Sequence, residues 1–182
     1  MSTYRMSRDW FVTIMTGVIL LLFALLAVSV WLAFATAPRE ISGLALLLVL
    51  AVCVAITAVA YLYTPTAIVM MDDGLRIERP IGAVILSYAV VRSVQSNDEW
   101  LGTSFKRPPG GNSGFFGIWG AFSSQTLGDY SMYGTKARGA VVIRTTDGTI
   151  VVTPDERDRF TRALLSRAAA REPGPIQPPP TA

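Results

Sequence analysis

Two long runs without charge, close to the N-terminus, restrict the possible folds of this chain more than any other feature. No charged residue occurs from residue 10 to 37, and after Arg39 and Glu40 none occurs from residue 41 to 71. A helix of about 20 apolar residues crosses the hydrocarbon core of a bilayer. The sequence therefore predicts a transmembrane helical hairpin over residues 10–63, with spans at about 11–34 and 42–63. Trp10 and Tyr63 supply aromatic residues at two of its ends, as membrane interfaces favour.

Two other interpretations of these runs are possible, a cleaved signal peptide and a buried helical hairpin. Ala35-Thr36-Ala37 resembles a signal-peptide cleavage site, but a signal peptide has an apolar region of only about 7 to 15 residues, and Pro38 would directly follow the cut. A buried hairpin in a globular protein is the second alternative, but neither run has a polar face that could meet water. Both are less favoured than two membrane spans.

The orientation follows from the short connection between the runs and from the basic residues. Residues 38–43 allow only an antiparallel hairpin, so both chain ends lie on one side of the membrane. Arg5 and Arg8 precede the first span, whereas Arg39 alone lies in the connection. The positive-inside rule then places both termini in the cytoplasm of a multi-pass cell-membrane protein.

The residue inventory excludes several kinds of site. The chain has no histidine, and its single cysteine, Cys53, lies in the second apolar run. Disulfides within the chain, zinc sites and Cys/His nucleophile pairs are therefore excluded. The net charge of +3 does not indicate a nucleic-acid partner. We expect no catalytic, cofactor or metal site, and an enzyme is the weakest functional hypothesis.

After the second run the pattern changes to that of strands, and residues 64–170 are predicted to form a β-rich domain. Asp72-Asp73-Gly74 is expected to be a turn, with Gly74 at a position that needs a positive φ. Asp147-Gly148, between two β-branched runs, is the strongest hairpin signal. The pattern predicts roughly seven strands before one final helix.

The final helix is predicted from a start signal and an apolar stripe. Thr153 is expected to cap it, Pro154 to occupy its first position and Glu156 to complete a capping box. The helix should run to about Ala169 and pack on the sheet. Residues 1–9 are predicted to be an N-terminal cytoplasmic segment, and residues 171–182 a disordered, proline-rich tail.

Several segments of the β region resemble one known family. They are residues 85–94, the glycine-aromatic segment 114–120, residues 127–130 with Tyr133, and residues 151–155 ahead of Phe160. Together they resemble the membrane-anchored members of the bacterial pleckstrin-homology-like (PH-like) domains over about residues 66–167. The resemblance implies a bent, mainly antiparallel β sheet or barrel closed by one C-terminal helix, and a binding or scaffold module without a catalytic motif.

The glycine-aromatic segment is the first candidate contact site. Phe115, Phe116, Ile118 and Trp119 are expected either to contact the bilayer interface or a partner, or to plug one end of the sheet. We favour partial burial, with Trp119 inside and Phe115 nearer the surface.

Lys106 and Arg107 flank that segment and form the second candidate site. Such basic residues attract anionic lipid headgroups by about 1 kcal/mol each, but ordinary solvated charge is the favoured interpretation. The predicted function is a membrane-anchored, non-enzymatic scaffold with an unknown protein partner, and homo-oligomers are compatible with it. The alternative is an accessory subunit that contacts a larger membrane complex through its spans.

Overall fold

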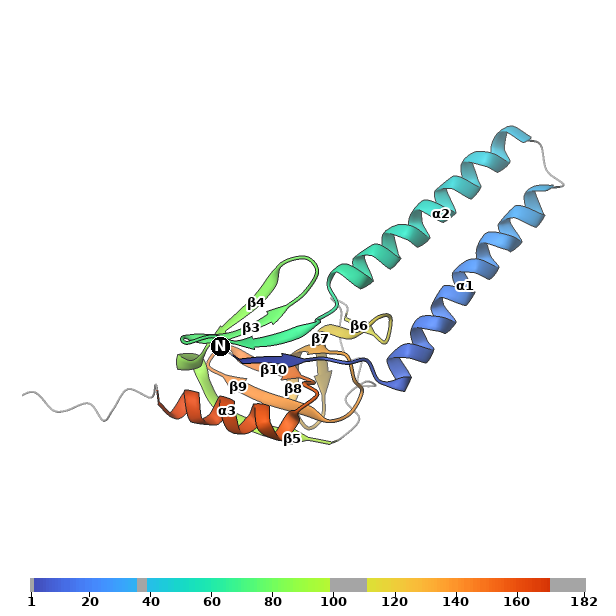
Figure 1. Cartoon of the computed structure of the whole chain (residues 1–182). Coiled ribbons are helices and arrows are strands. Elements are labelled where there is room, and N and C mark those ends of the chain that lie inside the picture. Colours follow the sequence, from blue (N-terminus) through green and yellow to red (C-terminus); the bar gives the residue numbers. More distant parts are fainter. Residues whose placement is uncertain (1, 36–38, 99–110, 171–182) are drawn as a thin grey trace, which may run out of the picture.

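The chain folds into a helical hairpin that projects from a β domain. The computed structural model describes residues 2–35, 39–98 and 111–170. The helices α1 (Trp10–Ala35) and α2 (Arg39–Leu62) run side by side away from the domain (Figure 1). The expected tail at 171–182 and residues 36–38, which join the helices, lie outside the described residues, whereas residues 39–43 of the predicted connection belong to α2.

Both hairpin helices are long and apolar enough to cross a membrane. The candidate spans are Trp10–Ala33 and Gly43–Leu62, and only 6% of each span window is buried within the protein. A core helix of a soluble protein would be mostly buried. The predicted pair of long apolar helices is therefore confirmed, and their surfaces are free to meet lipid.

The domain consists of two sheets and one C-terminal helix, α3 (Arg157–Ala169). The first sheet has the order β1-β2-β3-β4 and is antiparallel throughout. The second has the order β5-β9-β10-β8-β7-β6 and is antiparallel except for the β10–β8 pair. The strands of the first sheet are β1 (Ser2–Arg5), β2 (Ala67–Met70), β3 (Gly74–Glu78) and β4 (Ala83–Ser87). A short 3-10 helix, η1 (Tyr88–Val90), leads to the second sheet: β5 (Val91–Asn97), β6 (Asn112–Ser113), β7 (Ile118–Ser124), β8 (Gly128–Gly134), β9 (Ala140–Thr145) and β10 (Gly148–Val152). The predicted fold class, a two-helix hairpin followed by a mainly antiparallel PH-like β domain with one C-terminal helix, is confirmed.

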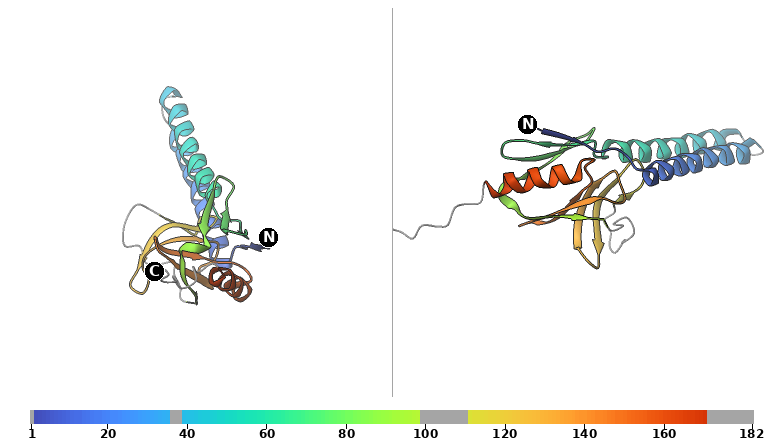
Figure 2. Two further views of the ribbon diagram at one scale, coloured as in Figure 1. Left: turned by 90° about the vertical axis from the view of Figure 1, so that its left-hand side faces the viewer. Right: turned by 60° about the horizontal axis from the view of Figure 1, so that its bottom comes forward.

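Strand β1 was not predicted. It precedes α1 in the sequence but pairs with β2, which follows α2, in the register Ser2↔Met70 to Arg5↔Ala67. The chain therefore leaves this sheet after β1, forms the helical hairpin, and returns to the same sheet at β2. Figure 2 shows β1 beside the other strands of this sheet, far from the connected tips of the helices.

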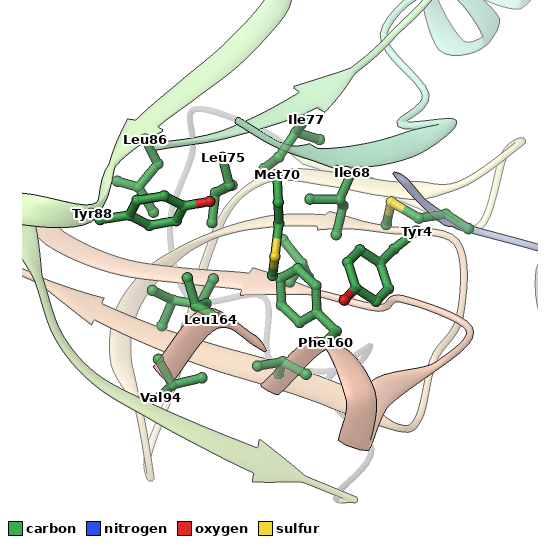
Figure 3. Close-up of a cluster of buried hydrophobic side chains, with 14 residues drawn as sticks. Tyr4, Ile68, Met70, Leu75, Ile77, Leu86, Tyr88, Val94, Phe160 and Leu164 are labelled. Atoms are coloured by element: carbon green, nitrogen blue, oxygen red, sulfur yellow. The ribbon is translucent and has the colours of Figure 1, made fainter. Parts of the chain in front are cut away.

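The main core lies between the two sheets, with α3 packed against it (Figure 3). Phe160 and Leu164 of α3 are fully buried against Ile68, Met70 and Leu75. The predicted packing of the final helix on the sheet is thereby confirmed. Burying a side chain of this size contributes about 1.5 to 3 kcal/mol.

A second core cluster lies on the other face of the second sheet. Along β9, Val141 belongs to the main core whereas Val142 belongs to the second cluster, because successive side chains of a strand point to opposite faces. Val12, near the start of α1, completes the second cluster and is fully buried. One hairpin helix is thus part of the packing of the domain.

Two local predictions were wrong. Gly74 does not adopt a positive φ; its role is to let β4 approach, because a Cβ there would lie 2.4 Å from the carbonyl oxygen of Leu86. The capping box at Thr153 does not form either. Helix α3 begins at Arg157, and the Thr153 hydroxyl is buried and accepts a hydrogen bond from the Thr135 amide at 2.9 Å. The Thr153 hydroxyl thus binds an amide distant in sequence and does not cap the helix.

Candidate functional site at the helix–domain junction

The N-terminal connection into α1 is held by polar contacts to the domain. The Asp155 carboxylate accepts hydrogen bonds from the Ser7 amide at 3.0 Å and the Ser7 hydroxyl at 2.6 Å. It also forms an ion pair with Lys136 at 2.6 Å. Burial opposes ionisation of this carboxylate, but the hydrogen bonds from Lys136 and Ser7 outweigh burial, so the pKa of Asp155 lies below its ordinary value. The segment before α1 is therefore tied to the segment before α3.

Asp9 directly precedes α1 and also binds the domain. One carboxylate oxygen accepts from the Val12 amide at 2.9 Å, which caps the helix, and the other accepts from the Ala137 amide at 2.8 Å. The Asp9 amide donates to the Thr135 carbonyl at 3.2 Å. An Asp directly before a long apolar run is a helix-start signal. That signal could have identified the cap from sequence, although not its second partner.

The connection that leaves α2 uses aromatic rings instead. Tyr63 packs against Trp119 with ring centroids 5.5 Å apart, and the Arg79 guanidinium lies 5.4 Å from the centre of the Tyr63 ring. The Ile81 amide, in the turn between β3 and β4, donates to the Leu62 carbonyl at 3.1 Å. This side of the junction therefore contacts the β3–β4 turn and β7.

The turn between β6 and β7 lies against the domain-proximal ends of both helices (Figure 1). The Gly114 amide donates to the Gly117 carbonyl at 2.9 Å and closes the turn. A Cβ at Gly114 would lie 3.1 Å from the Met15 Cβ of α1, so the turn approaches the helix backbone closely. The Thr16 hydroxyl of α1 accepts from the Phe116 amide at 2.9 Å.

Phe116 adopts an unusual backbone conformation in this turn. Its φ is +64°, and no other non-glycine residue in the described parts of the chain has a positive φ. A residue held in this way costs about 1 to 3 kcal/mol, and such residues cluster at functional sites. The hydrogen bond to Thr16 helps to keep Phe116 in this conformation.

The two phenylalanines of the turn pack against different helices. Phe115 lies edge-on to Phe23 of α1, with centroids 6.0 Å apart, and Phe116 lies edge-on to Tyr61 of α2 at 5.7 Å. The Arg8 guanidinium lies 5.3 Å from the centre of the Phe116 ring. The turn therefore forms an aromatic wedge, residues 114–117, between the bases of α1 and α2.

The structure assigns the four predicted contact residues differently from the sequence analysis. Phe115 is only 4% exposed and Ile118 is fully buried, whereas Phe116 and Trp119 are half-buried. The expected order, with Trp119 inside and Phe115 nearer the surface, was wrong, because Phe23 of α1 covers Phe115. Lys106 and Arg107 lie outside the described residues, so their predicted role stays a prediction.

Comparison with known families identifies the domain. A model of the bacterial PH domain matches residues 66–168, which is more than half of the 182-residue chain. The chain belongs to the bacterial PH domain family. No curated protein and no solved structure matches it. Strand β1 lies outside the matched range, so this bacterial PH domain is completed by residues that precede the helical hairpin.

The bacterial PH domain carries an open cleft beside β4. The cleft has a volume of about 730 Å³ and lies between β4 and the strands β7, β8 and β10. Ile85 and Leu86 line it on one side, and Asp129, Tyr130 and Asp147 on the other. Burial raises the pKa of the Tyr130 phenol above its ordinary value. No Lys or Arg lines the described walls of the cleft.

A groove of about 480 Å³ separates α1 and α2 next to the wedge. Phe23 and Ala24 of α1, Val54 and Ala58 of α2, and Phe116 of the bacterial PH domain line it. Within the described residues no group of three or more His, Cys, Asp or Glu side chains could hold a metal ion.

Proposed function

We propose that this protein is a membrane-anchored, non-enzymatic binding and scaffold protein that presents its bacterial PH domain at the cytoplasmic face of the cell membrane. Helices α1 and α2 form the anchor, and both chain ends face the cytoplasm. Arg5 and Arg8 before α1 support this orientation, since basic residues favour the cytoplasmic side.

The way in which the domain is attached supports a presenting role. The Asp155, Lys136 and Ser7 contacts hold one connection, and the Tyr63–Trp119 contact holds the other. A domain joined at two points to a pair of helices keeps one face toward the membrane. Its cleft then points in a fixed direction.

The observation that carries the proposal is the open cleft beside the edge strand β4. Among the described strands, β4 pairs with β3 alone, so its other edge offers backbone groups without a strand partner in that part of the chain. An extended peptide can add to such an edge through main-chain hydrogen bonds. Ile85 of β4 is 68% exposed and offers an apolar contact beside that edge.

The charge of the cleft defines the kind of partner. Asp129 and Asp147 are exposed in its wall, without a basic residue in the described lining. We therefore expect an extended segment of a protein partner that combines apolar side chains with Lys or Arg. Enzymatic chemistry is not part of this proposal, because a chain without histidine lacks the commonest general acid and base.

Peptide selection against the full chain in lipid nanodiscs tests the cleft. The peptides retained should be extended and basic, and they should protect the amides of β4 from hydrogen exchange. Ile85→Lys, which places a like charge on an exposed position, should abolish this binding, while Leu165→Lys on the exposed face of α3 should leave it unchanged. Acidic peptides, or protection outside β4, would refute this assignment.

Site-specific photo-cross-linking in native membranes separates this function from the alternative of an accessory subunit. A photoreactive residue at position 85 should capture a partner, whereas one at Val54, which lies on α2 and is 67% exposed, should not. Partners captured from position 54 alone would instead favour assembly through the helices. A reporter placed after Ala182 should be cytoplasmic and one placed at Glu40 external, and the reverse result would refute the orientation.

A further inference from the structure

The groove between α1 and α2 is lined mainly by apolar side chains. Thr57 is a polar residue in its wall, and its hydroxyl already donates to the Cys53 carbonyl of the preceding helical turn at 2.8 Å. If the helices span the membrane as proposed, this groove lies in the hydrocarbon region. A hydrocarbon chain then fits it, whereas a polar ligand would meet mainly apolar side chains there.

The groove ends on the aromatic wedge. Phe116 lines its base, with Tyr61 edge-on to the Phe116 ring. The positive φ of Phe116 and its amide hydrogen bond to Thr16 hold the ring in that place. A conformation of this kind persists only where the surrounding contacts require it. The ring therefore forms a fixed floor between the groove and the segment that precedes α1.

A cation lies at the same floor. The Arg8 guanidinium stands 5.3 Å from the centre of the Phe116 ring, and the Arg8 side chain is exposed. Across residues 2–35, 39–98 and 111–170, the ion pairs involve Lys136, Arg157 and Arg159 but not Arg8. Its charge is thus available to an anion at the base of the helices.

One ligand that satisfies both parts must be an amphiphile, with a hydrocarbon chain above the Phe116 ring and an anionic group at Arg8. We infer that this site, formed by the α1–α2 groove, Phe116 and Arg8, binds one anionic phospholipid of the surrounding bilayer. A helix from a second copy would fill the groove but would leave Arg8 without an anion. Charge complementarity therefore selects the lipid. This inference rests on the proposed membrane anchoring and is independent of the cleft at β4.

The test measures lipid retention by the full chain. The protein is released from nanodiscs that contain phosphatidylcholine and phosphatidylglycerol in equal amounts, and the bound lipids are counted by native mass spectrometry. We expect one phosphatidylglycerol to be retained in preference to phosphatidylcholine. Arg8→Gln should lower that preference about fivefold, as expected for one basic residue next to an anionic lipid surface.

Two matched controls make the result specific to this site. Arg5→Gln removes the same charge from an exposed residue of β1 close in sequence and should leave the preference unchanged. Ala24→Phe should fill the groove and reduce retention, whereas Ala51→Phe, at an exposed position of α2 outside the groove, should not. A phosphatidylglycerol with a photoreactive acyl chain should label Phe23 or Val54.

Three outcomes would contradict the lipid site or the anchoring on which it rests. Equal retention of both lipids, or an equal loss in Arg5→Gln, would overturn the site and indicate only general surface charge. A dimer that is dissociated by Ala24→Phe would show that a second copy occupies the groove instead of lipid. Removal of the chain from membranes by alkaline carbonate would refute the proposed anchoring, whereas an inserted chain without lipid preference would refute this site alone.

Discussion

The two connections between the helical hairpin and the domain are built from different chemistry. The segment before α1 contributes a strand, two buried side chains and a set of hydrogen bonds, so it is part of the folded domain. The segment after α2 is short: backbone hydrogen bonds join it to the domain, and its side-chain contact is the ring of Tyr63, which is 39% exposed. Damage to the first connection should therefore unfold the domain, while damage to the second should mainly loosen its attachment.

The largest effect is expected for Tyr4→Ala. Tyr4 of β1 is 5% exposed and lies edge-on to Phe160 of α3, with centroids 5.2 Å apart. Loss of a buried ring should lower the free energy of unfolding by about 3 kcal/mol. Pulse proteolysis of the full chain in nanodiscs would measure it. A loss below about 1 kcal/mol would mean that β1 is not an integral strand of the domain.

Removal of the Asp9 carboxylate should cause the next largest loss of stability. Asp9→Ala should cost about 2 kcal/mol, because it removes a helix cap and leaves the Ala137 amide without its acceptor. Asp9→Asn keeps one good cap oxygen and should lose about half as much. Thermal unfolding of both variants measures these losses. Equal losses would contradict the two roles of Asp9, as helix cap and as acceptor for the Ala137 amide.

Asp155 should make the N-terminal connection sensitive to acid. Because the folded-state pKa of Asp155 lies below its ordinary value of 3.8, its stabilisation is present above that value and is lost as the pH falls through the lower folded pKa. Asp155→Asn should cost about 1 kcal/mol or less at neutral pH, and the difference from the parent should vanish in acid. Asp158→Asn, at a well-exposed position, is the control. A difference that persists unchanged in acid would show that the charge of Asp155 is not what stabilises the connection.

The smallest effect is expected for Tyr63→Ala, the matched change on the second connection. We expect a loss below about 1 kcal/mol, because the Tyr63 ring is already 39% exposed in the parent and its removal gives up little buried area. Its effect should instead appear as faster proteolysis at residues 63–66 of the otherwise folded chain. A stability loss as large as that of Tyr4→Ala would remove the distinction between the two connections.

Local patterns predicted several elements of the fold. The Asp147-Gly148 turn joins β9 and β10 in the register expected of a hairpin, with Gly148 opposite Thr145. The apolar stripe of the last helix is buried as expected at Phe160 and Leu164. These features depend on neighbours that are close in sequence, and for that reason sequence patterns report them.

Other features depend on partners that are distant in sequence. Strand β1 has only residues 2–5 in which to show an alternating pattern, and its partner β2 lies beyond both helices. Thr153 has the sequence pattern of a helix cap, but its hydroxyl accepts a hydrogen bond from the Thr135 amide instead. The burial of Phe115 depends on Phe23, in a helix that local patterns treat as lipid-facing.

By itself, the sequence determined that this chain has two apolar helices long enough for a bilayer, and that a β domain with one closing helix follows them. The length of the uncharged runs is enough for the first conclusion, and the alternation of apolar residues is enough for the second. Only the tertiary structure decided that the N-terminus completes the first sheet and that Phe116 stands between Arg8 and an apolar groove. The physical reason is that these contacts join segments whose proximity is created by folding itself, so no local pattern encodes them.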